Sequence, residues 1–431
     1  MSTEKGLAGQ TNQQDTANRS AKNQSATGRR ALVVGLGISG IASAIALKQS
    51  GWEPVIVEKA PARRRGGYFI GLFGLGWIAA DHLGALPGLH DRRSPASQNF
   101  AIDRTGIIGD TLGFADAPAD FGPWMMLRGD VEQATFDALP DDVEIRYNTR
   151  PVDIWQNASG VRVTLEDSTT GERTQEEYEL LVGADGIHSQ VREMVFGPAQ
   201  KYLHELGTMI CAFELPENPP GLKPDQGVIL TEVGKAFWVF PFADHPATVL
   251  FTWASDDPGA ERKLDPKQHI REVFGDQPYG TYMEYALDQL DRADEFLYDT
   301  TEQVKMDSWH RGRVVLVGDS AWCPTLYSGM GATSGIGGAD LLGAALRKHP
   351  DDLDAALDGW EKVMRPKIAN FQKEGATQGR KNFVSLTQAE LDKRNKSVGQ
   401  RRKMIKNPIV GRLLKHVPMI RNRNADLTAL L

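Results

Sequence analysis

The sequence predicts an α/β fold in which a parallel sheet with covering helices carries an inserted antiparallel sheet and ends in a helical C-terminal segment. Near the N-terminus, residues 31–57 run as an apolar strand, a helical pattern and a second apolar strand. Two later apolar runs, 180–182 and 314–317, each end in glycine and predict further strands of the same sheet. Between them, at about 206–305, apolar and polar residues alternate as in antiparallel strands.

Composition and charge limit the classes of function open to this chain. Its 431 residues are 41% hydrophobic and 24% charged, which is ordinary for a globular protein of two or three domains. The net charge of -7 and the pI near 5.8 argue against general nucleic-acid binding, because a protein that tracks phosphates needs a dominant basic surface.

The cysteines and the N-terminal segment indicate where the protein works. Cys211 and Cys323 lie far apart with no Cys/His partner nearby, so we expect neither a disulfide framework nor a metal site, and the reducing cytoplasm is the expected location. No run of 18 or more apolar residues predicts a membrane span. Residues 1–29 are polar and lack the apolar stretch of a signal peptide, which predicts a disordered leader.

The first elements follow one another closely. Residues 31–34 predict a strand, residues 38–49 a helix and residues 54–57 a second strand. In residues 63–76, glycines cluster with aromatic residues, which suits a loop that closely approaches a flat ligand. A further helix is expected to begin near Trp77.

The turn after the first strand contains a glycine motif with a chemical meaning. Gly35 permits a tight turn, Gly37 lets the backbone approach a pyrophosphate, and Gly40 lets helix and strand pack closely. The helix N-terminus then supplies N–H donors and a favourable dipole. Glu58 closes the second strand and is placed to accept a hydrogen bond from a ribose hydroxyl. The motif predicts a Rossmann-like dinucleotide site, although NAD and FAD enzymes share it.

The middle of the chain predicts an inserted antiparallel sheet rich in aromatic residues. Its clearest strands are residues 208–213, 228–230, 236–240 and 248–253. The aromatic side chains there either pack the core of the sheet or wall an apolar substrate. The sequence leaves both interpretations open.

Three later segments narrow the choice of dinucleotide. Residues 180–192, LLVGADGIHSQVR, and residues 313–331, with Gly318-Asp319 and a glycine-rich continuation, resemble two motifs of the flavoprotein monooxygenases. Residues 126–139, with Arg128 at a helix start, match a third pattern. In these segments and their order, the chain resembles the class A, aromatic-hydroxylase-like monooxygenases of the para-hydroxybenzoate hydroxylase fold, in their natural-product branch.

This resemblance, which covers about residues 30–366, implies a Rossmann-like FAD-binding domain. It divides the chain into a leader (1–29), a first FAD-binding part with some substrate-side segments near 70–125 (30–205), a substrate-binding β-sheet domain (206–305), the return of the FAD-binding domain (306–378) and a basic helical segment (379–431). The residues expected at FAD are Gly35, Gly37, Ser39, Gly40, Glu58, Lys59, Arg65, Arg128, Asp185, Gly318, Asp319, Gly329, Gly331 and Ala332. Asp319 is expected at the ribityl chain. A purely structural alternative is that Asp185 and Asp319 cap helices.

The resemblance also implies a reaction. In that family NAD(P)H, here the expected co-substrate, reduces FAD, and the reduced flavin then activates O2 to oxygenate a substrate beside its ring, with no metal and no separate NAD(P)H-binding domain. We therefore expect hydroxylation or epoxidation of a small apolar aromatic or polyketide-like molecule, as in polyketide and antibiotic biosynthesis. Arg63, Arg64 and Arg65 either help bind phosphates or form a solvated charge run. No catalytic residue can be assigned, and His188 is the histidine of most interest.

Three departures from the family pattern, expected near the flavin, suggest a rival function. Trp322 stands where many relatives have His or Tyr, Leu326 where they have proline, and Gly71 where a more polar residue is common. Some proteins of this fold keep FAD as a scaffold and perform a redox-neutral cyclisation, such as a decalin-forming [4+2] closure, by folding a polyene into a reactive shape. A flavin-retaining cyclase is therefore the alternative to a monooxygenase.

The C-terminal part is predicted to be helical and basic. Residues 339–348 and 353–374 carry helical patterns, and residues 380–423 hold 13 Lys/Arg against two acids with interspersed apolar residues. This basic segment either packs over the FAD domain or docks to an acidic partner, such as a carrier protein, or to a membrane surface.

Overall fold

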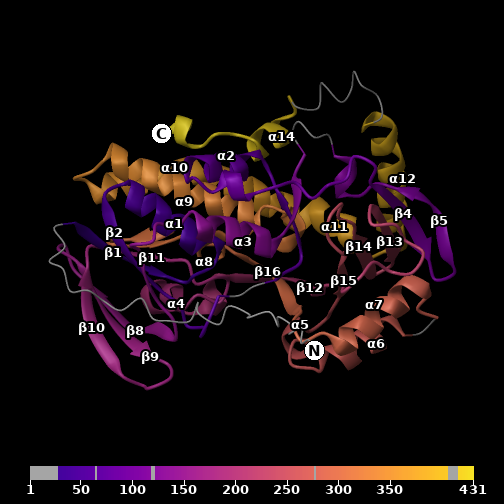
Figure 1. The fold of residues 1–431 in the computed structure, drawn as a ribbon, viewed down its shortest axis with the longest axis horizontal. Helices are drawn as coiled ribbons and strands as arrows, with labels where there is room; N and C mark the ends of the chain where they lie inside the picture. The colour runs from indigo at the N-terminus through magenta and orange to yellow at the C-terminus, as the bar shows by residue number, and fades with distance from the viewer. Residues whose placement is uncertain (1–27, 64–65, 118–121, 276–277, 406–415) are drawn as a thin grey trace, which may run out of the picture.

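The computed structural model describes residues 28–63, 66–117, 122–275, 278–405 and 416–431, and it consists of two halves, each centred on a sheet (Figure 1). The parallel sheet lies at the left of Figure 1, and the larger sheet, which is antiparallel except for one parallel pair of strands, β4 Gln98–Asp103 and β13 Gln226–Glu232, lies at the right. The predicted leader lies outside the described residues, except that the first strand already begins at Arg29. Within the described part of the chain, no helix is both long enough and apolar enough to cross a membrane.

The parallel sheet has the strand order β17-β18-β11-β1-β2-β7. Its strands are β1 Arg29–Val34, β2 Trp52–Val57, β7 Glu144–Arg146, β11 Leu180–Gly183, β17 His310–Arg311 and β18 Val314–Leu316. All neighbours run parallel except β17 and β18. The central strands β1, β2 and β11 end in apolar, buried residues because layers cover both faces. The structure thus confirms that the chain returns twice to the first sheet.

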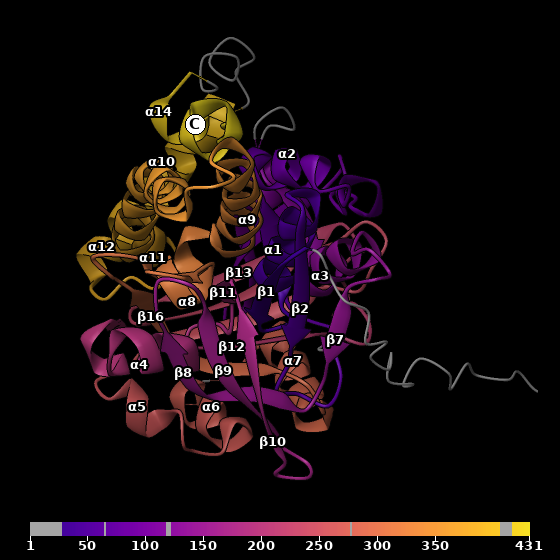
Figure 2. The ribbon, with the colours of Figure 1, turned by 90° about the vertical axis from the view of Figure 1, so that its left-hand side faces the viewer.

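Helices cover one face of this sheet and a small antiparallel sheet lies beneath the other, as Figure 2 shows. The covering helices are α1 Ile38–Gln49, α2 Gly74–His82, α3 Arg128–Asp137, α8 Asp319–Trp322, α9 Gly331–Lys348 and α10 Leu353–Glu374. The small sheet is β8 Thr149–Gln156, β9 Val161–Asp167 and β10 Arg173–Tyr178, and the helix α4 Gln190–Phe196 lies beside β8. Glycine lets α1 and α9 approach closely, since a Cβ on Gly343 would lie 2.9 Å from the Ala46 Cβ. The predicted bounds of α1 and α10 are confirmed.

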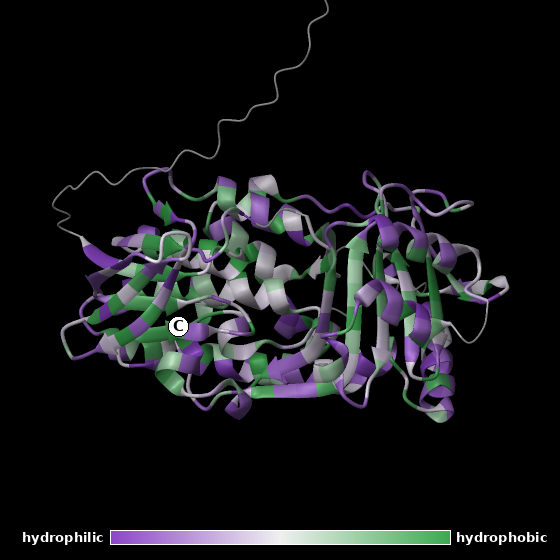
Figure 3. Ribbon diagram, turned by 90° about the horizontal axis from the view of Figure 1, so that it is seen from below, coloured by the Kyte–Doolittle hydropathy of each residue, from purple (hydrophilic) through white to green (hydrophobic). Residues whose placement is uncertain are grey.

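The larger sheet has the order β16-β12-β15-β14-β13-β4-β5, and its strands lie side by side in Figure 3. They are β4 Gln98–Asp103, β5 Gly106–Thr111, β12 Leu203–Glu214, β13 Gln226–Glu232, β14 Lys235–Phe240, β15 Thr248–Ala254 and β16 Leu297–Val304. The hairpin of β4 and β5 comes from the segment near 70–125, and β12 begins slightly before the predicted boundary at 206. A short pair, β3 Phe69–Leu72 and β6 Trp124–Leu127, stands where a loop was predicted.

The two faces of the larger sheet have different tasks. Phe237 and Phe251 point to one face, where they form a core with the helices α6 Pro266–Phe274 and α7 Thr281–Arg292, which follow the short helix α5 Pro258–Glu261. Trp238, Phe240 and Leu250 point to the other face and line a cavity. Because side chains alternate along a strand, the aromatic residues supply both a core and a ligand wall, and neither interpretation from the sequence excludes the other.

The C-terminal segment returns across both halves of the molecule. It contains a π-helical turn Gly375–Gly379 and the helices α11 Arg380–Phe383, α12 Gln388–Ile405 and α14 Pro418–Arg423. Helix α12 reaches the β4–β5 hairpin, where Arg402 forms an ion pair with Asp110. Just after α14, the Asn424 side chain accepts a hydrogen bond from the Gly74 amide at 2.8 Å. The segment therefore packs against the larger sheet as well as the parallel-sheet half.

Candidate active site

A cavity of about 910 Å³ lies between the two halves and has two chemically different ends. The end at the parallel sheet is lined by Gly37, Ile38, Ser39, Arg128, Ala184, Gly186, Asp319, Gly331 and Ala332. The end at the larger sheet is lined by aromatic residues, namely Tyr68, Phe69, Phe114, Trp238, Phe240, Tyr327 and Phe383. A polar nucleotide and a flat apolar molecule can therefore lie in one continuous space.

The glycine motif builds the turn that opens the polar end. Gly35 has a φ of +106°, and its N–H donates to the Val57 carbonyl at 2.8 Å. A Cβ on Gly40 would lie 1.9 Å from the Gly35 carbonyl oxygen, so this position requires glycine for packing. A Cβ on Gly37 would meet no protein atom within 4 Å, and Gly37 lines the cavity. Packing against other residues therefore does not explain why residue 37 is glycine.

Two helix N-termini point their free donors at this end. The N-cap of α1 is Gly37 and the N-cap of α9 is Met330, and neither provides a side-chain cap. Uncapped N–H groups and the positive ends of two helix dipoles favour a bound anion. Ser39, Gly331 and Ala332 line the cavity beside these termini. The arrangement fits the pyrophosphate of a dinucleotide.

Glu58 lies beside the turn, at the end of β2, rather than in the cavity lining. Its Oε2 accepts from the Leu36 amide at 2.8 Å and its Oε1 from the Ala60 amide at 2.8 Å. These bonds fix the carboxylate next to the glycine motif. The Lys59 side chain is exposed to solvent, and Arg65 lies outside the described residues.

Arg128 and Asp319 bring opposite charges into the cavity. The Nη1 of Arg128 is buried and has no hydrogen-bond partner among the described residues. Asp319 lies deep in the molecule but faces the cavity, and burial raises the pKa of its carboxyl, while Cys323 and Arg128 oppose the rise. A buried donor without an acceptor is costly, so Arg128 fits contact with a polar ligand such as FAD.

Two glycines shape the loop that carries Asp319. Gly318 has a φ of +74°, and a Cβ there would lie 2.3 Å from the Ser39 hydroxyl, so glycine is needed for the close approach. Gly329 has a φ of +65° and lines the cavity. The loop therefore brings Asp319 and the start of α9 against α1.

Asp185 caps a helix instead of lining the cavity. Its carboxylate accepts from the Ser189 hydroxyl at 2.6 Å and from the Gln190 and Val191 amides at 2.7 and 3.1 Å. Burial raises the pKa of Asp185, and these hydrogen bonds oppose the rise. This is the structural role that the sequence left open for Asp185. Its neighbours Ala184 and Gly186 line the cavity.

Arg63 is neither free for phosphates nor part of a solvated charge run. Its guanidinium donates to both carboxylate oxygens of Glu132, at 2.9 and 2.8 Å, and lies 3.6 Å from the centre of the Phe136 ring. The two side chains of this ion pair are 9% and 3% exposed. Both interpretations of Arg63 from the sequence are therefore wrong, because α3 supplies a buried acid that a linear pattern does not reveal.

The aromatic end forms a closely packed wall. Phe69 stacks on Phe240 with ring centres 4.4 Å apart, and Phe383 packs on Trp238 at 4.8 Å. The Tyr327 hydroxyl bonds with two threonine hydroxyls, and burial raises the pKa of this phenol. Such a wall excludes water and holds a flat ligand by stacking. The described lining residues include no histidine, so His188 does not reach the cavity.

The three departures from the family pattern lie in different places. Trp322 is fully buried among other tryptophans and does not line the cavity, so its side chain does not face the space for a ligand. Leu326 and Gly71 do line it. A Cβ on Gly71 would lie 3.0 Å from the Pro123 Cβ, which gives glycine a packing reason at this position.

The comparisons with known proteins agree with this geometry. The family model described as "FAD binding domain" matches residues 134–353, about half of the chain. A "Flavin-dependent monooxygenase" from an unknown prokaryotic organism is 29% identical over 362 residues, which cover 80% of this chain and 87% of that protein. The chain belongs to the FAD-dependent monooxygenase family. FAD is accordingly the cofactor that the polar end of the cavity fits.

Solved structures share the fold of this monooxygenase. The tetracycline destructase Tet(51) is 25% identical, superimposes with a TM-score of 0.71, and the match covers 89% of this chain and 97% of the destructase. Klebsiella pneumoniae HpxO, solved with FAD and uric acid, is 20% identical with a TM-score of 0.70, and the match covers 89% and 98% of the two chains. The α/β fold is thereby confirmed.

Sequence reasoning missed the contribution of the C-terminal segment to this flavoenzyme's cavity. The residues that it adds to the lining are Gln378, Gly379, Asn382, Phe383, Arg394, Val398, Arg401, Met404, Met419, Ile420 and Arg423. It also missed Thr325, which has a φ of +74° and a buried hydroxyl without a partner among the described residues. The helical pattern predicts helices but not where they dock, so no signal in the sequence identifies these residues.

Proposed function

We propose that this flavoenzyme uses NADH or NADPH together with O2 to hydroxylate or epoxidise a small aromatic or polyketide-like molecule. The observation that carries the proposal is the continuous cavity of about 910 Å³, which joins the uncapped helix termini to the aromatic wall. A relative's name supports the substrate class, since tetracycline destructase indicates a polycyclic substrate for that protein.

The chain's own residues have three tasks in this reaction. The starts of α1 and α9 and the Arg128 guanidinium hold FAD, which supplies the redox chemistry and the activation of oxygen when it is bound. Phe69, Phe240 and Trp238 orient the substrate by stacking, at the end of the cavity opposite the pyrophosphate site. The enclosed apolar wall keeps water from the reacting atoms.

The redox-neutral cyclase is not favoured. The relatives that match along most of the chain and carry a functional name are monooxygenases. The departure at Trp322 no longer supports a cyclase, because this side chain lies in the buried core. The glycine at position 71 is explained by its packing against Pro123. Leu326 is the one departure that lines the cavity without a packing explanation.

The proposal is tested by flavin reduction. The protein is reconstituted with FAD and mixed anaerobically with NADH or NADPH, with and without polycyclic phenols, and the loss of flavin absorbance is followed by stopped flow. We expect reduction that an aromatic substrate accelerates, and oxygenated product by mass spectrometry when O2 is admitted. Flavin that stays oxidised with every nicotinamide, while a polyene substrate is still converted to an isomer of equal mass, would instead establish the cyclase.

A further inference from the structure

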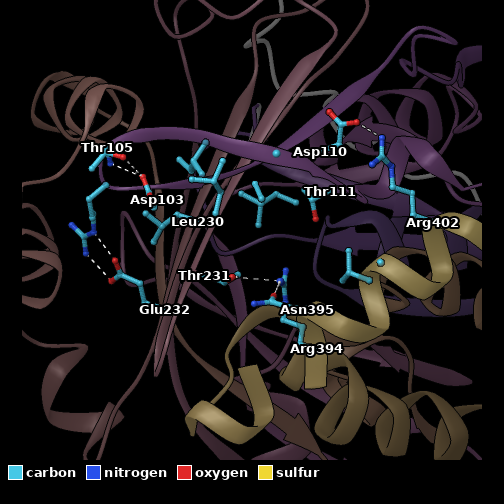
Figure 4. A pocket seen from close by; sticks show the side chains of 18 residues that line it. Asp103, Thr105, Asp110, Thr111, Leu230, Thr231, Glu232, Arg394, Asn395 and Arg402 are labelled. Carbon is cyan, nitrogen blue, oxygen red and sulfur yellow. Dashed lines mark hydrogen bonds and ion pairs between the residues drawn. The ribbon is translucent and has the colours of Figure 1, made fainter. Parts of the chain in front are cut away.

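Arg394 lies where α12 separates the substrate cavity from a second cavity. The second cavity has a volume of about 810 Å³ and lies between the β4–β5 hairpin, β13 and α12. Arg394 lines both cavities. Figure 4 shows its side chain reaching from α12 towards Thr231 on β13.

The charge of Arg394 has no carboxylate partner within the described chain. Its side chain is buried, and its Nε donates to the Asn382 carbonyl at 2.7 Å. Its Nη1 donates to Asn395 Oδ1 at 3.0 Å and to the Thr231 hydroxyl at 3.4 Å, and all three acceptors are neutral. Burial and the nearby charge of Arg401 lower the pKa of Arg394 to about 10.

Two acids that line the second cavity together with Arg394 are paired with other arginines. Glu232 on β13 accepts two hydrogen bonds from Arg104, at 2.6 and 2.8 Å, and Asp110 pairs with Arg402 (Figure 4). A buried cation without a counter-ion is destabilising, and it is retained where a ligand supplies the opposite charge.

Beside this guanidinium lies a buried donor that has no acceptor in the described part of the chain. The Trp238 side chain is 5% exposed and lines the substrate cavity, and its indole N–H has no acceptor among the described residues. The Arg394 guanidinium lies 5.9 Å from the centre of the Trp238 ring. Two buried donors therefore lie at the edge of an apolar, aromatic cavity.

We propose that Arg394 and Trp238 form a subsite for an anionic oxygen of the substrate, such as a carboxylate, a phenolate or an enolate on an aromatic ring. The inference rests on the proposed function and refines it, because the substrate then carries one acidic oxygen on an otherwise apolar frame. Arg394 forms the ion pair and the Trp238 N–H donates to the same oxygen or to an adjacent one. Both residues determine specificity and take no part in oxygen transfer.

The test compares two probes with the same ring system and different charge. The FAD-loaded full-length protein is titrated with 2-naphthoate and with 2-naphthalenemethanol, and each Kd is measured from the change in flavin absorbance. We expect the wild-type protein to bind 2-naphthoate at least tenfold more tightly than the alcohol, as a charge-assisted hydrogen bond predicts. Arg394→Gln should remove this preference and leave the Kd of the alcohol within about threefold.

Matched variants separate recognition from folding. Arg402→Gln, on the same helix but paired with Asp110, should keep the preference. Arg394→Lys should restore part of it, and Trp238→Phe, which keeps an aromatic ring but removes the N–H, should reduce it several-fold. If Arg394→Gln does not fold, the lysine and phenylalanine variants and the wild-type comparison still decide the matter.

Three results would overturn the inference: equal binding of both probes by the wild type, an equal loss for both probes in Arg394→Gln, or a preference lost only in Arg401→Gln. The titration needs neither nicotinamide nor O2. A protein that prefers the anion yet shows no substrate-stimulated flavin reduction would keep the subsite and refute the proposed function. Substrate-stimulated flavin reduction without a preference for the anion would refute the subsite and keep the proposed function.

Discussion

Gly37 offers the sharpest test of how this protein binds FAD. A methyl group at this position meets no protein atom within 4 Å, and the backbone has a φ of -85° that alanine adopts readily. The Gly37→Ala variant should therefore fold with a free energy of unfolding within about 1 kcal/mol of the wild type, the usual cost of alanine at an N-cap. The methyl group does, however, project at the start of α1, where the pyrophosphate approaches.

The expected loss lies in FAD affinity. If the methyl group displaces the pyrophosphate from one backbone N–H, one hydrogen bond to a charged group is lost, which costs about 1.5–3 kcal/mol. This free energy corresponds to a roughly 10- to 150-fold higher Kd for FAD. The Kd is measured from flavin fluorescence on titration of the apoprotein, and urea unfolding of the apoprotein provides the stability.

Gly40→Ala is the matched control. Its Cβ would lie 1.9 Å from the Gly35 carbonyl oxygen, so the turn must shift, and we expect a loss of about 1–3 kcal/mol in the stability of the apoprotein itself. An unchanged Kd for FAD in Gly37→Ala would refute the placement of the pyrophosphate at α1. A loss of apoprotein stability in Gly37→Ala equal to that in Gly40→Ala would refute the reasoning from the open space around Gly37.

Further predictions concern buried charges. Arg63→Met should lower the free energy of unfolding by about 3–5 kcal/mol in urea, because it leaves Glu132 buried and unpaired, whereas loss of FAD affinity without loss of stability would contradict this structural role. Arg128→Met should raise the Kd for FAD about tenfold without destabilising the apoprotein, since it removes a buried donor that has no partner; an unchanged Kd by fluorescence titration would exclude the contact. Burial lowers the pKa of His82, but the hydrogen bond and charge of Asp340 outweigh it and raise the pKa above 6.5. The contribution of His82 to stability is therefore complete below pH 6.5 and declines as the pH rises through the folded-state pKa, so urea midpoints of the wild type and His82→Gln should converge at higher pH.

Local patterns predicted the main elements of the parallel-sheet half, although α9 begins at Gly331 and not at the predicted residue 339. The limits of α1, Ile38–Gln49, and α10, Leu353–Glu374, follow from local residue patterns: α10 buries one apolar stripe along its length, whereas α1 is rich in small and apolar residues and is buried on almost every side. The strand–helix–strand unit and the later motifs also indicated the family and its cofactor. The geometry of the glycine motif depends on nearby residues alone, since the clash of a Cβ at Gly40 with Gly35 involves residues of the same turn.

Contacts between distant segments were not predictable in the same way. Arg63 pairs with Glu132, Trp322 packs into the core, and α12 brings Arg394 to the substrate cavity, each across a large separation in the chain. A charge run or an amphipathic pattern indicates that a side chain needs a partner, but the pattern does not identify that partner. The sequence by itself determined the fold class and the dinucleotide turn, because these depend on short-range periodicity and on backbone conformation, and the resemblance of its later motifs indicated the flavin family. Only the tertiary structure decided which side chains face the substrate, because docking of the C-terminal helices depends on surfaces that exist only after the two sheets have formed.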